Sequence, residues 1–165
     1  MKTKVARMIL TALVVTVVAA GAGYGAAGGS QSVSVAAAAN IDISVPATAS
    51  IASTLPGVCG STSTTINVKS NKTWNLQMRS EPVGYPNGRA KNGLGAEMFN
   101  QMQFRGGDVL AFTNMGATYA PLYTLAQAKT TGLGRNVSVD YQQCVDYADD
   151  PATYTIVVEY LGVQF

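Results

Sequence analysis

The chain has 165 residues, of which 47% are hydrophobic and only 12% are charged, with two cysteines and no histidine. A net charge of +2 offers no electrostatic basis for binding nucleic acid, and the lack of histidine excludes Ser-His-Asp and Cys-His catalytic groups. No phosphate-binding loop, dinucleotide fingerprint or nucleophile-elbow motif is present, so we expect no enzyme, no cofactor and no metal site.

Residues 1–27 have the layout of a secretion signal peptide. Three cations in the first seven residues precede an uncharged apolar run at 8–20, and small-residue cleavage patterns follow at 20–22 and 25–27. A retained membrane anchor is the alternative, because residues 8–29 are uncharged and long enough to span a bilayer. The glycines and alanines at the end of that stretch favour cleavage. We therefore expect an extracellular protein at the cell surface, with no membrane contact after cleavage and a net charge of −1.

The segment 28–45 is predicted to be an extended strand. Its sequence from residue 32, SVSVAAAANIDISV, alternates strictly between apolar and polar or small residues, which is typical of a half-buried strand. Fourteen extended residues span roughly 46 Å, whereas a typical strand has about 5–6 residues. Part of this strand should therefore leave its own domain and pair with a neighbour. Its apolar face consists of Val33, Val35, Ala37, Ala39, Ile41, Ile43 and Val45.

Residues 46–165 are predicted to form one all-β domain, a β-sandwich of jelly-roll or immunoglobulin-like type, because short alternating stretches are separated by turn-forming residues. We expect a hairpin of two strands at 64–69 and 74–79, a more buried strand at 107–113, and further strands at 136–142 and 153–161. Loops are expected at 60–63, 80–95 and 130–136. Two segments are ambiguous: 97–104 fits a strand or two helical turns, with strand favoured, and 121–129 fits a short helix.

Cys59 and Cys144 are predicted to form a disulfide, since an even number of cysteines in an exported protein most simply means pairing. The bond would close a loop of about 85 residues, and the chain-entropy model gives it up to about 4 kcal/mol. Two free thiols are the alternative.

Three further groups of residues suggest chemistry, each with a structural alternative. Asp146, Asp149 and Asp150 are oxygen ligands of the kind that Ca²⁺ prefers, but a solvated turn before Pro151 is favoured. The only tryptophan shares a strand face with apolar residues, so a core position is favoured over a sugar-stacking platform formed by Trp74, Tyr85, Tyr119 and Tyr123. The sequons at Asn71 and Asn136 are candidate glycosylation sites.

Two motifs resemble small secreted β-sandwich domains of prokaryotic surfaces. INVKSNKTWNL at 66–76 is similar to their central hairpin, and ATYTIVVEY at 152–160 is similar to their closing strand. With the signal and the donor-like strand, the layout resembles spore-coat-U-type and TasA-like fibre subunits and the archaeal bundling pilins. The resemblance implies a structural subunit joined by donor-strand complementation, and only the amino-terminal strand carries over as a functional element.

We therefore expect a homopolymer: a filament or pilus subunit whose amino-terminal strand fills a groove in the next copy, without a nucleic-acid or membrane partner. One alternative is a monomeric secreted sandwich whose first strand simply crosses between sheets. The other is a carbohydrate-binding or adhesive surface module.

Overall fold

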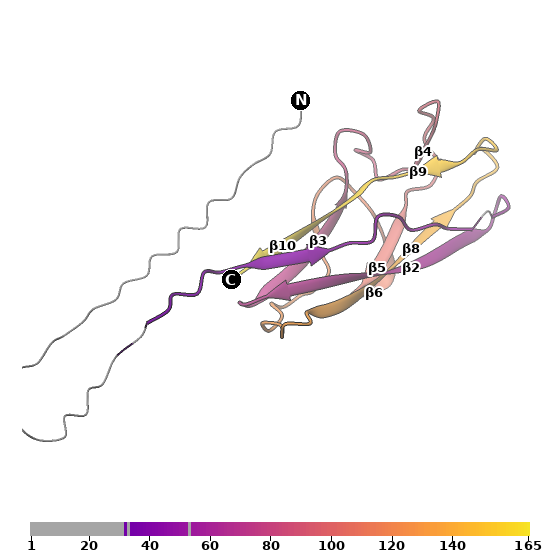
Figure 1. The fold of residues 1–165 in the computed structure, drawn as a ribbon. Helices are drawn as coiled ribbons and strands as arrows, with labels where there is room; N and C mark the ends of the chain where they lie inside the picture. Colours follow the sequence, from indigo (N-terminus) through magenta and orange to yellow (C-terminus); the bar gives the residue numbers. More distant parts are fainter. Residues whose placement is uncertain (1–31, 33, 53) are drawn as a thin grey trace, which may run out of the picture. The chain divides into compact units, whose positions relative to one another are not determined.

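The computed structural model describes Ser32, residues 34–52 and residues 54–165; the predicted signal peptide at 1–27 and Val33 lie outside this part (Figure 1). The chain divides into two units, Met1–Ala38 and Ala39–Phe165, and the fold below is that of the second. Its described residues contain strands and no helix, which confirms the all-β class. The strands are β1 (Ile41–Ser44), β2 (Cys59–Ser70), β3 (Trp74–Ser80), β4 (Lys91–Asn92), β5 (Gln103–Gly106), β6 (Val109–Asn114), β7 (Ala120–Pro121), β8 (Arg135–Cys144), β9 (Tyr154–Thr155) and β10 (Val158–Gln164).

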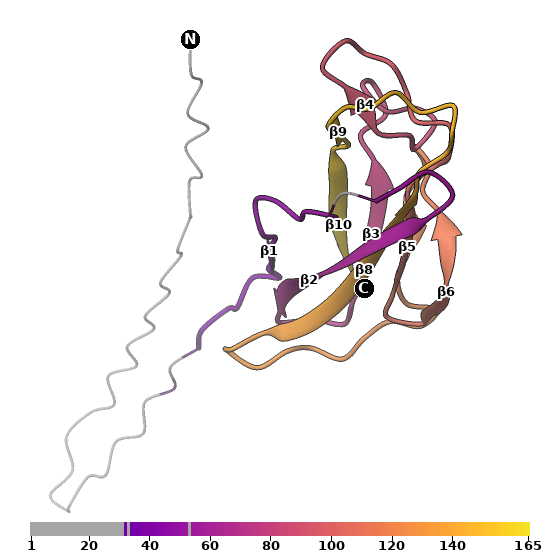
Figure 2. The ribbon, with the colours of Figure 1, turned by 90° about the vertical axis from the view of Figure 1, so that its right-hand side faces the viewer.

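The strands form two main antiparallel sheets. One has the order β1-β2-β8-β5-β6, and the other has the order β10-β3-β7. The short β4-β9 pair lies at the opposite end of the domain from the C-terminus (Figure 2). Each sheet is built on one long strand pair: β2 with β8 in the first and β3 with β10 in the second.

A single apolar core joins the two sheets. Alternate residues of β2, β8 and β5 face it from one sheet, and alternate residues of β3 face it from the other, as expected for two sheets packed face to face. This shared core fits the predicted sandwich. Its buried members are Ile66, Val68, Trp74, Leu76, Met78, Met102, Phe104, Met115, Leu122, Tyr123, Val137, Val139 and Tyr141.

The predicted hairpin of 64–69 with 74–79 is wrong. The strands exist, but β2 pairs with β1 and β8 whereas β3 pairs with β10 and β7, so residues 71–73 carry the chain from one sheet to the other. Both strands turn an apolar face to the same core, and alternation cannot distinguish strands that pair edge to edge from strands that face each other. The predicted loop at 60–63 is also wrong, because these residues extend β2 and pair with β8.

The observed boundaries of several other strands differ from the predicted ones, because tertiary contacts override the local sequence pattern. The strand predicted at 107–113 starts later, as β6, and it is a mostly exposed edge strand in which Leu110 is 83% exposed. The favoured strand at 97–104 is reduced to its last residues, in β5. The stretch 121–129 forms no helix; Leu122 and Gln127 bond to the backbone of β3 instead. The stretch 153–161 divides into β9 and β10.

The remaining predicted loops also carry short pieces of strand. The two residues of β4 lie within the loop predicted at 80–95. The loop predicted at 130–136 is shorter than expected, because β8 already begins at Arg135.

The structure confirms the disulfide between Cys59 and Cys144. Cys59, the first residue of β2, lies directly opposite Cys144 of β8 in the register of the two strands. The bond therefore ties together the two longest strands of the larger sheet.

Candidate functional site: a groove at the edges of β2 and β10

The expected strand at 32–45 is much shorter than predicted. Only β1 is a strand; Ser32 and residues 34–40 are exposed and form no regular structure, and Val35 is 84% exposed. Alanine has a low strand propensity, so the alanine-rich stretch 36–39 needs a partner edge to become extended. The strand ends before Pro46, which has no N–H to donate to a ladder.

β1 closes part of the gap between the two sheets. It pairs with the last four residues of β2 and also lies against β10 (Figure 1). Ile41 and Ile43 are half-buried and point toward the core, as their parity predicted. They pack over Gly162 of β10, where an added Cβ would lie 2.6 Å from Ile41 Cδ1 and 2.7 Å from Ile43 Cδ1. Glycine there lets β1 approach β10 closely.

The start of β1 is anchored at Asn40. The Asn40 N–H donates to Asn71 Oδ1 at 2.8 Å, and the Asn71 N–H donates to the Asn40 carbonyl. Gln164 Nε2 also donates to that carbonyl, at 2.8 Å. The residue that precedes β1 is therefore held beside Gln164, next to the C-terminal residue Phe165.

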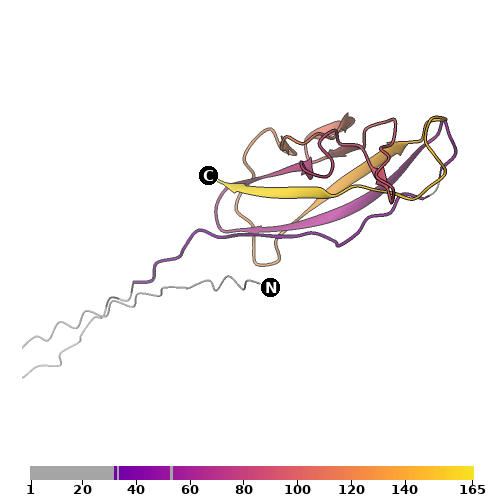
Figure 3. The same ribbon diagram turned by 90° about the horizontal axis from the view of Figure 1, so that it is seen from above.

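Beyond β1, the same gap between the sheets is open as a groove of about 880 Å³. On this side, residues 60–66 of β2 lack a described strand partner, since they pair with β8 only, and β10 pairs with β3 only. The described chain that follows β1, residues 45–52 and 54–56, continues toward the start of β2 (Figure 3). We call it the strap, because it runs along the groove.

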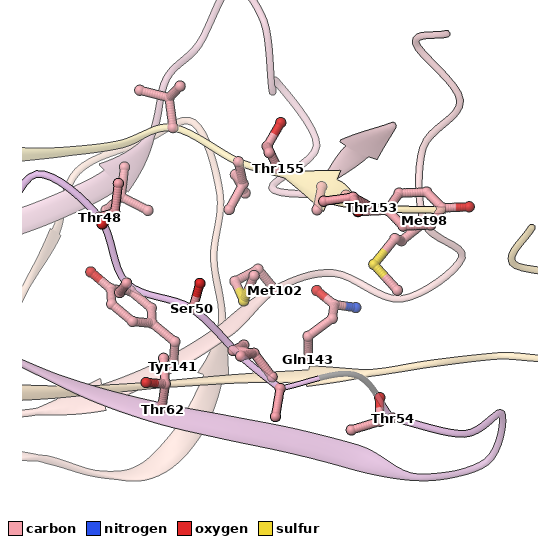
Figure 4. Close-up of a pocket in the computed structure, with 18 of the residues that line it drawn as sticks. Thr48, Ser50, Thr54, Thr62, Met98, Met102, Tyr141, Gln143, Thr153 and Thr155 are labelled. Carbon is pink, nitrogen blue, oxygen red and sulfur yellow. The ribbon is translucent and has the colours of Figure 1, made fainter. Parts of the chain in front are cut away.

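The strap is held weakly. Within its described part, only Leu55 makes a backbone–backbone hydrogen bond, accepting from the Val58 N–H. Its side chains are exposed apart from Ile51 and Thr54, which are half-buried. Figure 4 shows the strap passing between the chain that carries Thr153 and Thr155 and the strand that carries Thr62.

The groove is apolar at its floor and lined by hydroxyl groups. Met98, Met102 and Ile156 contribute apolar surface, and threonines project from three sides (Figure 4). Gln143 is 6% exposed; its Nε2 donates to the carbonyls of Asn100 and Cys144, but its Oε1 accepts no hydrogen bond from the described residues. A buried acceptor without a donor is costly, so this atom favours an occupant with a polar hydrogen.

Two tyrosines bridge the sheets inside the groove. The Tyr141 hydroxyl of β8 is hydrogen-bonded to the Tyr160 hydroxyl of β10. Burial raises the pKa of the Tyr141 phenol above its ordinary value. Burial also raises the pKa of Tyr160, and the neighbouring Tyr141 oxygen adds to that effect. Both phenols therefore stay protonated at neutral pH and work as a structural link.

The other predicted site residues lie apart from the groove or serve the fold. Trp74 is fully buried, its Nε1 donates to the Ala128 carbonyl at 2.8 Å, and its ring meets Tyr123 edge-on, so it does not form a sugar platform. Tyr119 stacks beneath Arg79 instead.

The aspartate cluster binds its own backbone. Asp149 accepts hydrogen bonds from the N–H groups of Phe99 and Asp146, and Asp146 accepts one from Ala148. These bonds are those of a capped turn, as the structural alternative predicted. Of the described residues, no three acidic, cysteine or histidine side chains are grouped to hold a metal ion.

The two sequon asparagines are exposed, and their glycosylation stays a prediction. Asn71 anchors Asn40, and Asn136 Oδ1 accepts from Asn67 Nδ2. Of the predicted donor face, Val45 lines the groove, whereas Ala37 and Ala39 are exposed. The unpaired edge of β2, the Tyr pair and Gln143 were missed, because each depends on which strands become neighbours.

The sequence matches no protein-family model, and comparison with curated proteins also gave no match. In the part of the chain that the structure describes, there is no helix long and apolar enough to cross a membrane.

The tyrosine pair predicts how stability depends on pH. An unfolded phenol loses its proton near pH 10.0, whereas the folded pair holds its protons to higher pH, so the free energy of unfolding should fall as pH rises above about 10. Urea unfolding between about pH 8 and pH 11 measures this fall. Replacing both residues by phenylalanine should flatten it, leaving a remainder from buried Tyr123. Parallel losses in wild type and double variant would contradict this role.

Proposed function

We propose that the protein is a structural subunit of an extracellular filament, in which the amino-terminal segment of one copy docks on the next. The observation that carries this proposal is a pairing deficit. Residues 60–66 of β2 have a described strand partner on one side only, and residues 34–39 are exposed and form no strand.

The physical chemistry of strand addition supports the proposal. An exposed strand edge presents unpaired N–H and C=O groups, which proteins usually cover or pair. An added strand satisfies them with main-chain hydrogen bonds, while pockets for alternate side chains set specificity. Because donor and acceptor are different surfaces of one chain, the contact does not close on itself and produces an open fibre.

Composition and the disulfide are consistent with a surface protein. Few charges allow subunits to pack closely without strong repulsion. A disulfide is typical of an oxidising compartment outside the cytosol. We therefore place the filament at the cell surface, after removal of the signal peptide.

Truncation tests the proposal. A chain that begins at Gly28 should polymerise, and one that begins at Ala39 should fold equally well but stay monomeric, because Ala39–Phe165 is the compact unit. Light scattering and negative-stain microscopy measure assembly, and thermal unfolding checks the fold. If the longer chain stays monomeric, the monomeric carbohydrate-binding or adhesive module becomes the better reading. If the truncated chain forms the same fibres, another surface joins the subunits.

A matched pair of substitutions tests which face of the segment is buried. Ala37→Trp places a large ring on the face that should enter the neighbour, and overpacking of this kind costs about 1–3 kcal/mol at every joint. Ala36→Trp places the same ring on the opposite face. Fibre yield should fall strongly for Ala37→Trp and little for Ala36→Trp, with equal melting temperatures for the two monomers. Equal yields would contradict insertion of the odd-numbered face.

A further inference from the structure

We infer, resting on the proposed function, that the acceptor is the groove between residues 60–66 of β2 and the edge of β10, and that the strap is a gate on it. The occupant is residues 34–39 of a second copy, which enters by displacing the strap. Four features of the domain carry this inference: matching lengths, a fixed direction, the parity of the side chains, and the weak attachment of the strap.

The lengths agree. Six donor residues span about 20 Å when extended, and the seven residues of the unpaired β2 edge span about 23 Å at ~3.3 Å per residue. The donor would begin where β1 ends, so the two segments together would line most of β2. β1 of the acceptor copy stays in place.

Direction follows from the anchor at Asn40. β1 runs antiparallel to β2, with Ile41 opposite Ser70 and Ser44 opposite Asn67. If residues 34–39 of a second copy extend along β2 in the same direction as β1, the Asn40 of that second copy lies near Cys59 of the acceptor. The end of the second copy that carries Asn40 then meets the Cys59 end of the first. The opposite direction would bring the second domain against β1, in the middle of the edge.

Side-chain parity then sets the contacts. Even-numbered residues of β2 face inward, and β1 pairs its odd-numbered residues with them, as Ile43 does with Val68. A donor obeying the same rule along residues 60–65 places Val35, Ala37 and Ala39 opposite the inward positions Thr64, Thr62 and Gly60, respectively. Both threonines line the groove, and small donor side chains suit the narrow space between them and β10.

The described residues of the strap line this groove without pairing with β2. Ile51 is its half-buried anchor, and its Cγ2 would lie 2.6 Å from a Cβ added at Gly60. Since Pro46 interrupts the strand and the described strap residues before Leu55 make no backbone–backbone hydrogen bond, the β2 edge stays unpaired beneath it. A donor strand that can pair along this edge has an advantage that the strap lacks.

A substitution that fills the groove tests whether the groove is the acceptor. Thr64→Trp fills it, and Thr65→Trp, on the exposed face of the same strand, is the matched control. In the chain that begins at Gly28, Thr64→Trp should raise the critical concentration for polymerisation at least about tenfold, equivalent to about 1.4 kcal/mol per joint. Thr65→Trp should leave it unchanged. The Thr64→Trp chain keeps its donor, so mixing it with the chain that begins at Ala39 should give a complex of one copy each that grows no further.

A substitution that weakens the packing of the strap tests independently whether the strap hinders entry of the donor. Ile51→Ala should speed polymerisation about tenfold, as expected if a contact of about 1.4 kcal/mol in the closed state is lost. An unchanged or slower rate would overturn the gate, even if Thr64→Trp proved unable to fold.

The outcomes separate the two proposals. If wild type polymerises, truncation abolishes assembly and folded Thr64→Trp still assembles normally, the acceptor lies elsewhere and only this inference fails. If the chain that begins at Gly28 never polymerises, the proposed function fails and the inference with it. If Thr64→Trp does not fold, Thr62→Trp applies the same block two residues away, and its normal assembly would overturn the groove.

Discussion

The apolar core lies between two sheets whose edges at β2 and β10 must be closed against water on one side. On that side, four residues of β1 pair with β2 and pack on Gly162 of β10, and Gln164 of β10 donates a hydrogen bond to Ser70 of β2. Farther along the edge, Tyr141 and Tyr160 bridge the sheets within a groove that the strap crosses. The position of β1, the close approach at Gly162 and the open groove all follow from this incomplete closure.

The opposite side of the core is closed differently. The stretch that follows β7 runs along β3, where Leu122 and Gln127 bond to its backbone and Trp74 is buried with its indole N–H satisfied by Ala128. No comparable backbone pairing holds the described part of the strap. The contrast explains why we assign assembly to the β2 and β10 edges. A solvent-exposed edge with main-chain groups to satisfy is a general site of strand addition.

The sequence predicted the strand content well, because the apolar residues of β3 and β8 alternate strictly and the disulfide follows from simple counting. It failed on which strands are neighbours. Ile66 and Trp74 lie on faces that look alike in the sequence, yet they belong to opposite sheets. The groove was beyond prediction for the same reason: it depends on Tyr141 of β8 meeting Tyr160 of β10, and on Ile41 and Ile43 packing over Gly162. Alternation in residues 32–45 correctly predicted the inward face of β1, but it carried no information on where pairing stops.

The central claim is that the β2 edge is unpaired in the monomer and paired in the assembled protein. Amide hydrogen exchange, followed by mass spectrometry of peptides from residues 60–66, tests it most directly in monomer and fibre. Amides in this segment that point away from β8 should exchange rapidly in the monomer and become strongly protected in the fibre, while peptides from edge strand β6 should change little. Fibres in which residues 60–66 exchange as fast as in the monomer would contradict it.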